Sequence, residues 1–199
     1  MLALLAGLML LVTAFAQNQS SRDPHQAFLR RLVAATIERT RHTVRYDGAY
    51  VAIPSHGGDV PADTGVCTDE IIRSYRAVGV DLQKEVHDDM AKNFSSYPQI
   101  WGLKHAEPSI DHRRVPNLKT FFTRKGEKLA VTNRSEDYAP GDLVAWDLGH
   151  GINHIGIVVD QKASGGRYMV VHNIGEGPKM EDVLFSWKIT GHYRYFGPA

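Results

Sequence analysis

The sequence predicts one α+β domain, in which N-terminal helices pack on an antiparallel β-sheet. Three observations support this fold class. The 199 residues fit a single domain with one core. Helical periodicity dominates the first part of the chain, whereas the last third contains β-rich runs separated by short turns. The composition, 43% hydrophobic and 23% charged, is typical of a folded protein rather than a disordered one.

The N-terminus has the pattern of a secretory signal peptide. Residues 2–12 are almost wholly apolar, and Ala14-Phe15-Ala16 offers small residues for signal peptidase. The apolar run is too short to span a bilayer comfortably. We therefore predict a signal peptide over residues 1–16, cleavage after Ala16, and one mature domain over 17–199 in the periplasm or outside the cell. Because no Lys or Arg precedes the run, an uncleaved anchor is the alternative; after cleavage we expect no stable membrane insertion.

The first helix is expected to begin at Asp23-Pro24, with Asp23 as N-cap and Pro24 in the first helical position. A 3.6-residue rhythm of apolar residues continues it to about Arg41. The residues of this rhythm are Phe28, Leu29, Leu32, Val33 and Ile37.

Turns and further helices follow. Residues 46–65 are rich in Gly and Pro and predict turns rather than long elements. At Cys67 the pattern changes to a helix, which Gly79 ends. Residues 81–137 mix short helices and loops, with one helix expected over 118–124 and closed by a glycine.

The last third of the chain predicts strands. β-rich runs occupy residues 143–146, 155–160 and 168–172, and residues 161–166 form a Gly-ended hairpin loop between the last two. A final run over 183–195 adds aromatic and β-branched residues. Helices first and antiparallel strands afterwards give the α+β assignment.

Cys67 is the only cysteine, so it cannot form an intrachain disulfide. An unpaired thiol in an exported protein is either a small buried core residue or a functional group. Here it stands where a glycine-rich loop turns into a helix. Unpaired N–H groups and the helix dipole favour a thiolate at this place, and we expect them to lower the thiol pKa. The Cys67 amide can also donate to a developing oxyanion.

A base for this thiol is expected at His154, which opens a predicted core strand. His172, on the next strand, can orient the far ring nitrogen of His154, and Asn173 is the alternative polar partner. A structural role at a strand end is the alternative for His154. The chain order of Cys, His and a polar orienter is compatible with a papain-like arrangement.

Five motifs stand out along the chain: Gly57-Gly58, Gly65-Val66-Cys67-Thr68-Asp69, Pro140-Gly141-Asp142-Leu143-Val144, His154-Ile155-Gly156-Ile157 and Val171-His172. Together they resemble the pattern of the NlpC-type cell-wall peptidases. The resemblance implies a papain-like NlpC-type fold. It also implies a catalytic triad of Cys67, His154 and His172, and peptidoglycan stem peptides as the substrate class.

A longer likeness covers roughly residues 25–196. The strings over 58–69 and 111–117 are similar to a bacterial family catalogued as domain of unknown function 1287. The chain departs from the NlpC-type pattern at the nucleophile. Val66 stands where those enzymes carry Asp, and Thr68-Asp69 stands where they carry Ser-Gly.

The candidate substrate-binding residues stand in or beside these motifs. They are Ser55, Asp59, Asp69, Trp146 and Asn173. Ser55 and His56 stand where the NlpC-type pattern has a tyrosine that often assists the oxyanion site, and Tyr50 is only nearby. The sequence therefore identifies no second oxyanion donor. Asp69 also fits a first-turn helix charge. Arg113-Arg114 is interpreted as a solvated face, with a clamp on a substrate carboxylate as the alternative.

Metal and nucleic-acid functions are not favoured. His150 and His154 have the spacing of a helical zinc pair, but Gly149 and Gly151 break any helix and the expected glutamate is missing. On a helix, the adjacent residues 87–89 would point in different directions. We therefore predict no metal and no cofactor. A formal net charge of +1 gives no electrostatic reason to expect nucleic acid as a partner.

The sequence thus predicts an exported cysteine peptidase or amidase. His154 takes the thiol proton, Cys67 attacks an amide carbonyl, the imidazolium protonates the leaving amine, and water releases the acyl group. Residues 81–137 are expected to build one wall of the cleft. Two alternatives stay open: an acyltransferase or amidase acting on a small amide, and a non-catalytic exported domain that binds the cell wall.

Overall fold

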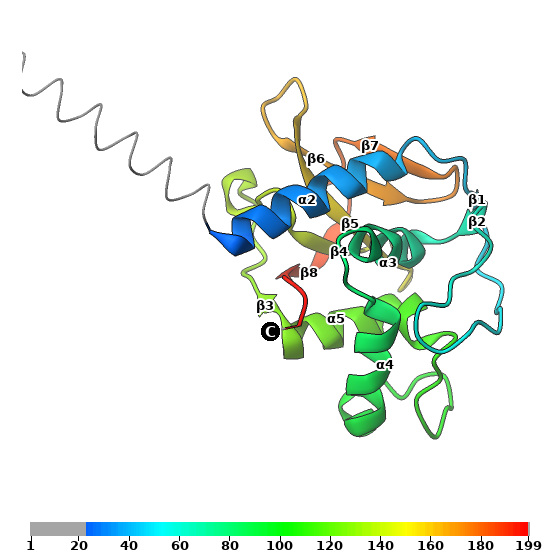
Figure 1. Ribbon diagram of the computed structural model, residues 1–199. Coiled ribbons are helices and arrows are strands. Elements are labelled where there is room, and N and C mark those ends of the chain that lie inside the picture. Colours follow the sequence, from blue (N-terminus) through cyan, green and yellow to red (C-terminus); the bar gives the residue numbers. More distant parts are fainter. Residues whose placement is uncertain (1–22, 199) are drawn as a thin grey trace, which may run out of the picture.

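The fold is a helical layer on a six-stranded antiparallel sheet (Figure 1). The computed structural model describes residues 23–198, so the predicted signal peptide lies outside the described residues. The sheet order is β3-β8-β4-β5-β6-β7. Its strands are β3 (Glu127–Lys128), β4 (Leu143–Asp147), β5 (Asn153–Lys162), β6 (Tyr168–Asn173), β7 (Pro178–Glu181) and β8 (Lys188–Arg194). A separate parallel pair joins β1 (Arg45–Tyr46) to β2 (Thr64–Gly65).

Four α-helices are described: α2 (Pro24–Arg39), α3 (Cys67–Ala77), α4 (Leu82–Lys92) and α5 (Val115–Lys125). The predicted start of α2 is confirmed, because the Asp23 carboxylate accepts a hydrogen bond from the His25 amide at 2.9 Å. The end of α3 is confirmed too, since Gly79 follows it with φ +92°. α5 begins three residues before its predicted position, and α4 was expected only as part of a mixed region.

The predicted strands are confirmed at β4, β5 and β6, which extend one or more residues beyond the expected runs. The final run over 183–195 is only partly a strand. Its first residues form a turn, closed by a 2.9 Å hydrogen bond from the Ser186 amide to the Val183 carbonyl, and β8 starts at Lys188. β7 was not predicted.

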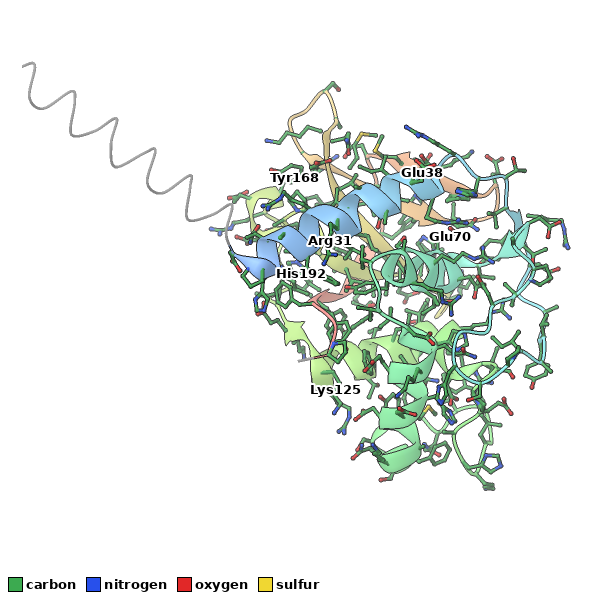
Figure 2. The ribbon with its side chains drawn as sticks, viewed as in Figure 1. Arg31, Glu38, Glu70, Lys125, Tyr168 and His192 are labelled. Atoms are coloured by element: carbon green, nitrogen blue, oxygen red, sulfur yellow. The ribbon has the colours of Figure 1, made fainter. Side chains whose placement is uncertain are left out.

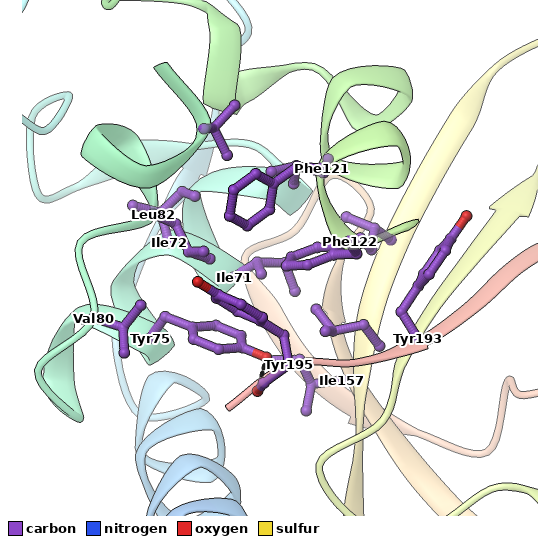
Figure 3. Packing of buried hydrophobic residues seen from close by; sticks show 14 of the residues in the cluster. Ile71, Ile72, Tyr75, Val80, Leu82, Phe121, Phe122, Ile157, Tyr193 and Tyr195 are labelled. Atoms are coloured by element: carbon purple, nitrogen blue, oxygen red, sulfur yellow. Dashed lines mark hydrogen bonds between the residues drawn. The ribbon is translucent and has the colours of Figure 1, made fainter. Parts of the chain in front are cut away.

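The main core lies between the helices and one face of the sheet (Figure 3). Successive strand residues point to opposite faces, so Ile155 and Ile157 of β5 meet the helices. Figure 3 shows Tyr75 of α3 beside Tyr195, whose carbonyl accepts the Tyr75 hydroxyl hydrogen at 3.0 Å. Phe122 of α5 packs in the same cluster and is fully buried.

A second, smaller core covers the opposite face of the sheet. It consists of Tyr138, Val144, Trp146, Val158, Val170 and Leu184. The turn that replaces the start of the predicted last strand closes this face, because the Leu184 carbonyl accepts from the Trp146 indole N–H at 3.0 Å.

Helix α2 crosses the strands at β5 and β6, and a charged contact ties it to α3 (Figures 1 and 2). Figure 2 shows Glu70 on α3 beside α2, and Arg39 of α2 donates to this carboxylate at 2.8 Å. This contact holds the helix that begins at Cys67 against the long N-terminal helix. In the described part of the chain, no helix is both long and apolar enough to cross a membrane.

Candidate active site

Cys67 is the first residue of α3 and is only 4% exposed. It follows β2 directly, through Val66. The carboxylate of Asp69, in the first turn, accepts from the Val66 amide at 2.7 Å and so caps the helix from within. The predicted loop-to-helix position of Cys67 is therefore present, and it is rigidly held.

The sulfur of Cys67 lies at the opening between β5 and β6. Backbone amides of Ile155, Thr68 and Cys67 itself reach the sulfur. The Val158 amide donates to the Asp142 carbonyl at 2.8 Å, on the β4 side of β5. Successive amides along a strand point alternately to its two neighbouring strands. The Ile155 amide therefore points towards β6.

Pairing with β6 starts only at Ile157, opposite Val171. The Ile155 amide is therefore not used in the β5–β6 ladder and is available to the thiol. The same opening holds the end of β2, because the Asn173 side chain donates to the Gly65 carbonyl at 3.4 Å. The start of α3 thus meets the sheet where two neighbouring strands separate.

The expected low pKa of the Cys67 thiol is not observed. Burial raises the pKa of Cys67 to about 12, and the charge of Asp69 acts in the same direction. Hydrogen bonds from the three backbone amides lower the pKa but do not offset the burial. The helix terminus was visible in the sequence and the burial was not, so the prediction was wrong. The resting group is a thiol.

His154 is the second residue of β5 and lies on the sheet face opposite Ile155. Its ring stacks on Trp146, the residue paired with it on β4, at 5.8 Å between centroids. Trp187 closes the other side at 6.0 Å. Burial and the neighbouring His172 lower the pKa of His154 to about 3, so the imidazole is neutral at physiological pH.

The structure brings His154 and His172 together. Nε2 of His154 and Nδ1 of His172 are 2.8 Å apart, and both rings are buried. Asn173, the alternative partner, bonds elsewhere: its amide donates to the Gly65 carbonyl, and its oxygen accepts from the Gly175 amide at 3.2 Å. Asn173 thus anchors the segment before Cys67 rather than the histidine.

Gly156 makes the approach of the two histidines possible. A Cβ atom there would lie 2.7 Å from Val170 Cγ1, 2.9 Å from the Val171 carbonyl oxygen and 3.1 Å from the His172 Cβ. Any side chain would therefore push β6 away from β5 and separate His172 from His154.

Cys67 and the His154 ring are not bonded: Cys67 lies in the helix-covered core with Ile155, whereas the His154 ring stacks on Trp146 on the opposite face of the sheet. Within residues 23–198 the thiol makes no hydrogen bond to the ring, although the amide of the next residue, Ile155, reaches the sulfur. Nδ1 of His154 has no hydrogen-bond partner in this part of the chain, whereas its Nε2 is used by His172. The nitrogen that would act as a base is therefore free.

Tyr46 is a candidate site residue that the sequence did not reveal. It lies on β1, paired with Gly65 two residues before Cys67. Burial, followed by the negative charges of a Cys67 thiolate and of Asp69, raises the pKa of Tyr46 to about 12. Its side chain is still 42% exposed. The hydroxyl is thus a candidate second oxyanion donor beside the Cys67 amide.

Arg113 is buried, contrary to the expectation of a solvated face or a substrate clamp. It donates to both carboxylate oxygens of Asp69, at 2.9 and 3.0 Å, and to the carbonyls of Ala49 and Asp47. Asp69, which also caps α3, therefore has both oxygens occupied. Asp69 therefore holds Arg113, and Arg113 holds the loop before β2. This corrects the predicted role of Asp69 as a substrate-binding residue.

The remaining predicted substrate-binding residues, Asp59, Trp146 and Ser55, differ in their solvent exposure. Asp59 accepts from Arg73 at 3.0 and 3.2 Å, and Arg73 also donates to the Thr64 carbonyl, so this pair shapes the loop before Cys67. Trp146 is fully buried, which corrects its predicted direct contact with a substrate. Ser55 lies in an exposed turn.

Comparison with known proteins identifies the family. The family described as "Domain of unknown function (DUF1287)" matches residues 33–195. The chain belongs to this family. A relative described as "Uncharacterized protein YijF" of Escherichia coli (strain K12) is 53% identical over 154 residues, which cover 77% of this chain and 75% of the relative.

The DUF1287 match includes the candidate site residues Tyr46, Cys67, His154 and His172. Two crystal structures of a protein described as an N-acetylmuramoyl-L-alanine amidase from Bacteroides uniformis ATCC 8492 share its fold. Their TM-scores are 0.53 and 0.52, at 12% and 13% identity. They cover 84% of this chain, which covers 98% and 97% of theirs.

The histidines outside the site do not assemble a metal centre in this DUF1287 domain. Over residues 23–198, no three His, Cys, Asp or Glu side chains converge in a way that could hold a metal ion. His150 sits in the turn between β4 and β5 with φ +54°. His87 pairs with the buried carboxylate of Asp111 at 3.2 Å.

Proposed function

We propose that this DUF1287 protein is a cysteine hydrolase that cleaves an amide bond of peptidoglycan stem peptides through an acyl-enzyme on Cys67. The observation that carries the proposal is the place of the Cys67 sulfur. It lies at the N-terminus of α3, in the opening between β5 and β6, next to the strand start that holds His154 and its partner His172. A nucleophile, a base and an orienting group are the parts that covalent amide hydrolysis needs.

The chemistry follows from the free nitrogen of His154. Nδ1 takes the thiol proton while the sulfur bonds to the amide carbonyl carbon, and the oxyanion accepts from the Cys67 amide and the Tyr46 hydroxyl. The C–N bond then breaks, and the imidazolium gives its proton to the leaving amine. Water, deprotonated by His154, hydrolyses the thioester and restores the thiol.

In the free protein, the Cys67 thiol and the His154 imidazole are both neutral. Burial raises the pKa of Cys67 and lowers the pKa of His154. Proton transfer is therefore unfavourable until a substrate changes the surroundings. We expect a bound amide to exclude water, to bring the thiol into hydrogen-bond contact with Nδ1, and to provide the oxyanion that the N–H donors stabilise.

Two features support peptidoglycan as the substrate class. The chain shares its fold with two structures described as an N-acetylmuramoyl-L-alanine amidase. Its apolar N-terminal segment, with Ala14-Phe15-Ala16, also predicts export, which would bring the mature domain into contact with the cell wall. The periplasmic or secreted location, and cleavage after Ala16, belong to this proposal.

One observation favours a second function, a non-catalytic domain that binds the cell wall. The thiol is buried, its pKa is raised, and it makes no hydrogen bond to His154 among the described residues. Such a domain would keep the fold and bind peptidoglycan equally well when Cys67 is replaced.

A digest followed by mass spectrometry separates the two functions. The mature chain from Gln17 and its Cys67→Ala variant are each incubated with purified peptidoglycan under reducing conditions. We expect new fragments from the wild type alone, and their masses identify the bond that is cut. An added amine in the same reaction tests transfer to an acceptor other than water. Wall binding by both chains, with fragments from neither, would support the binding domain.

A further inference from the structure

The histidine pair continues to a carboxylate that the sequence did not mark. Nε2 of His172 lies 3.0 Å from Oε2 of Glu181. Glu181 is the last residue of β7 and is paired with Val170 of β6. It is therefore the diagonal neighbour of His172 on the same face of the sheet, within reach of a long side chain. A continuous row of three side chains then leads from Glu181 through His172 to His154.

The donor and acceptor roles along this row are determined from its outer end. An ionised carboxylate only accepts hydrogen bonds, so the Glu181 contact requires a proton on Nε2 of His172. A neutral imidazole carries one proton, which leaves Nδ1 of His172 as an acceptor. Nε2 of His154 must then donate across the 2.8 Å contact. The proton of His154 is thereby held on Nε2, and its Nδ1 has a free lone pair.

The charged groups around His172 agree with this assignment. The Glu181 carboxylate is 42% exposed and stays solvated, whereas the His172 ring is 1% exposed. Lys179, also on β7, pairs with Glu176 and acts against a positive charge on His172. From β5, only the neutral His154 ring bonds to His172. A hollow of about 260 Å³, lined in part by Ile174, Glu176 and Lys179, opens beside His172 and Glu181.

We propose that Glu181 is a positioning residue that fixes the proton on Nε2 of both His172 and His154, and so keeps Nδ1 of His154 ready to take the Cys67 proton. This inference rests on the proposed function for its catalytic meaning. The tautomers themselves are a property of the folded protein, and they can be measured without a substrate.

The direct test is the ¹⁵N NMR spectrum of the histidine rings at neutral pH, in the wild type and in Glu181→Ala. Protonated and unprotonated ring nitrogens differ clearly in chemical shift. We expect a proton on Nε2 of both His154 and His172 in the wild type, and mixed tautomers at both rings in Glu181→Ala. A wild-type proton on Nδ1 of His154, or unchanged tautomers in Glu181→Ala, would overturn the proposal.

Two further variants separate positioning from a general effect of the substitution. Glu181→Gln keeps an acceptor oxygen, so the wild-type tautomers should persist. Glu176→Ala removes a neighbouring exposed carboxylate that bonds Lys179 and not His172, so it should also leave both rings unchanged. Circular dichroism reports whether each variant is folded. Mixed tautomers in Glu176→Ala, to the same extent as in Glu181→Ala, would contradict a specific role of Glu181.

Peptidoglycan hydrolysis by the same variants gives the catalytic readout. We expect the rate to fall at least about tenfold in Glu181→Ala, because a misplaced tautomer removes the general base. Glu181→Gln and Glu176→Ala should stay within about threefold of the wild type. If the wild type shows the expected tautomers but no hydrolysis, the proposed function fails and the positioning role stands. Full activity in Glu181→Ala would exclude a catalytic role for the row.

Discussion

The two faces of the sheet are built on different physical principles. The helix-covered face holds Ile155 and Ile157 of β5 in a core with Phe122, where the burial of apolar side chains is the main stabilising contribution. On the opposite face, the same strand presents His154, buried between Trp146 and Trp187 and bonded to a second imidazole. Burying polar rings costs free energy that only their hydrogen bonds offset. The comparison teaches that apolar burial holds the helix-covered face, which also contains Cys67, whereas the opposite face buries a hydrogen-bonded histidine pair.

The largest effect on stability is expected on the helix-covered face. Phe122→Ala removes a fully buried ring that packs against Phe121, Tyr193 and Tyr195. The lost transfer energy and the cavity should reduce the free energy of unfolding by about 3–5 kcal/mol. Urea unfolding measures it. A loss below about 1 kcal/mol would mean that this face does not carry the core.

The sheet face that holds His154 and His172 should make the stability of the fold depend on pH. Burial lowers the pKa of His154 from 6.5 to about 3, so the unfolded chain binds a proton in this interval and the folded chain does not. Its contribution is fully present above pH 6.5 and is lost as pH falls towards 3. The slope for one proton is up to about 1.4 kcal/mol per pH unit.

His112, whose pKa burial lowers to about 4, contributes in the same direction. The comparison is therefore between the wild type and His154→Gln, with unfolding free energies taken at pH 7, 6, 5 and 4. We expect the slope of the variant to be smaller by roughly one proton. Equal slopes in the two proteins would show that His154 is not buried as a neutral ring.

A smaller loss of stability is expected at Gly156, where β6 packs closely against β5. Gly156→Ala places a Cβ 2.9 Å from the Val171 carbonyl and should destabilise the fold by about 1–3 kcal/mol. It should also separate His172 from His154 and abolish hydrolysis in chains that are still folded. The matched control is Gly165→Ala in the β5–β6 hairpin loop, where a Cβ meets nothing within 4 Å. A loss of similar size in the control would remove the argument from close packing.

The sequence predicted the apolar face well. Asp23 and Pro24 mark one helix start, Gly79 marks a helix end, and the β5 and β6 runs are long enough to reveal their strands. These signals are local, because they depend on backbone preference and on side-chain periodicity.

The polar parts of the site were less predictable, for three reasons. β7, which carries Glu181, is four residues long, begins with proline and is mostly not buried, so it lacks a strand pattern. Arg113 is buried only because it meets Asp69, which lies 44 positions earlier in the chain. The pKa of Cys67 depends on burial, which three-dimensional packing decides. Long-range contacts of this kind leave no periodic signal in a single sequence.

The smallest effect concerns the thiol itself. Because Cys67 is 4% exposed and its pKa is raised to about 12, iodoacetamide should label it slowly at pH 7. We expect a rate at least about tenfold below that of the urea-unfolded chain, rising with pH and without a plateau below pH 8. A fast reaction that levels off below pH 8 would instead indicate a stabilised thiolate in the free protein.

The most direct test of the central claim is the intact mass of the protein from an acid-quenched reaction with a peptidoglycan stem peptide. Acid preserves a thioester, so the covalent intermediate is trapped as it forms. We predict an added mass equal to the acyl fragment, located on Cys67 by peptide mapping and absent from Cys67→Ala. Cleaved products without any adduct on Cys67, formed equally well by Cys67→Ala, would contradict the proposed function.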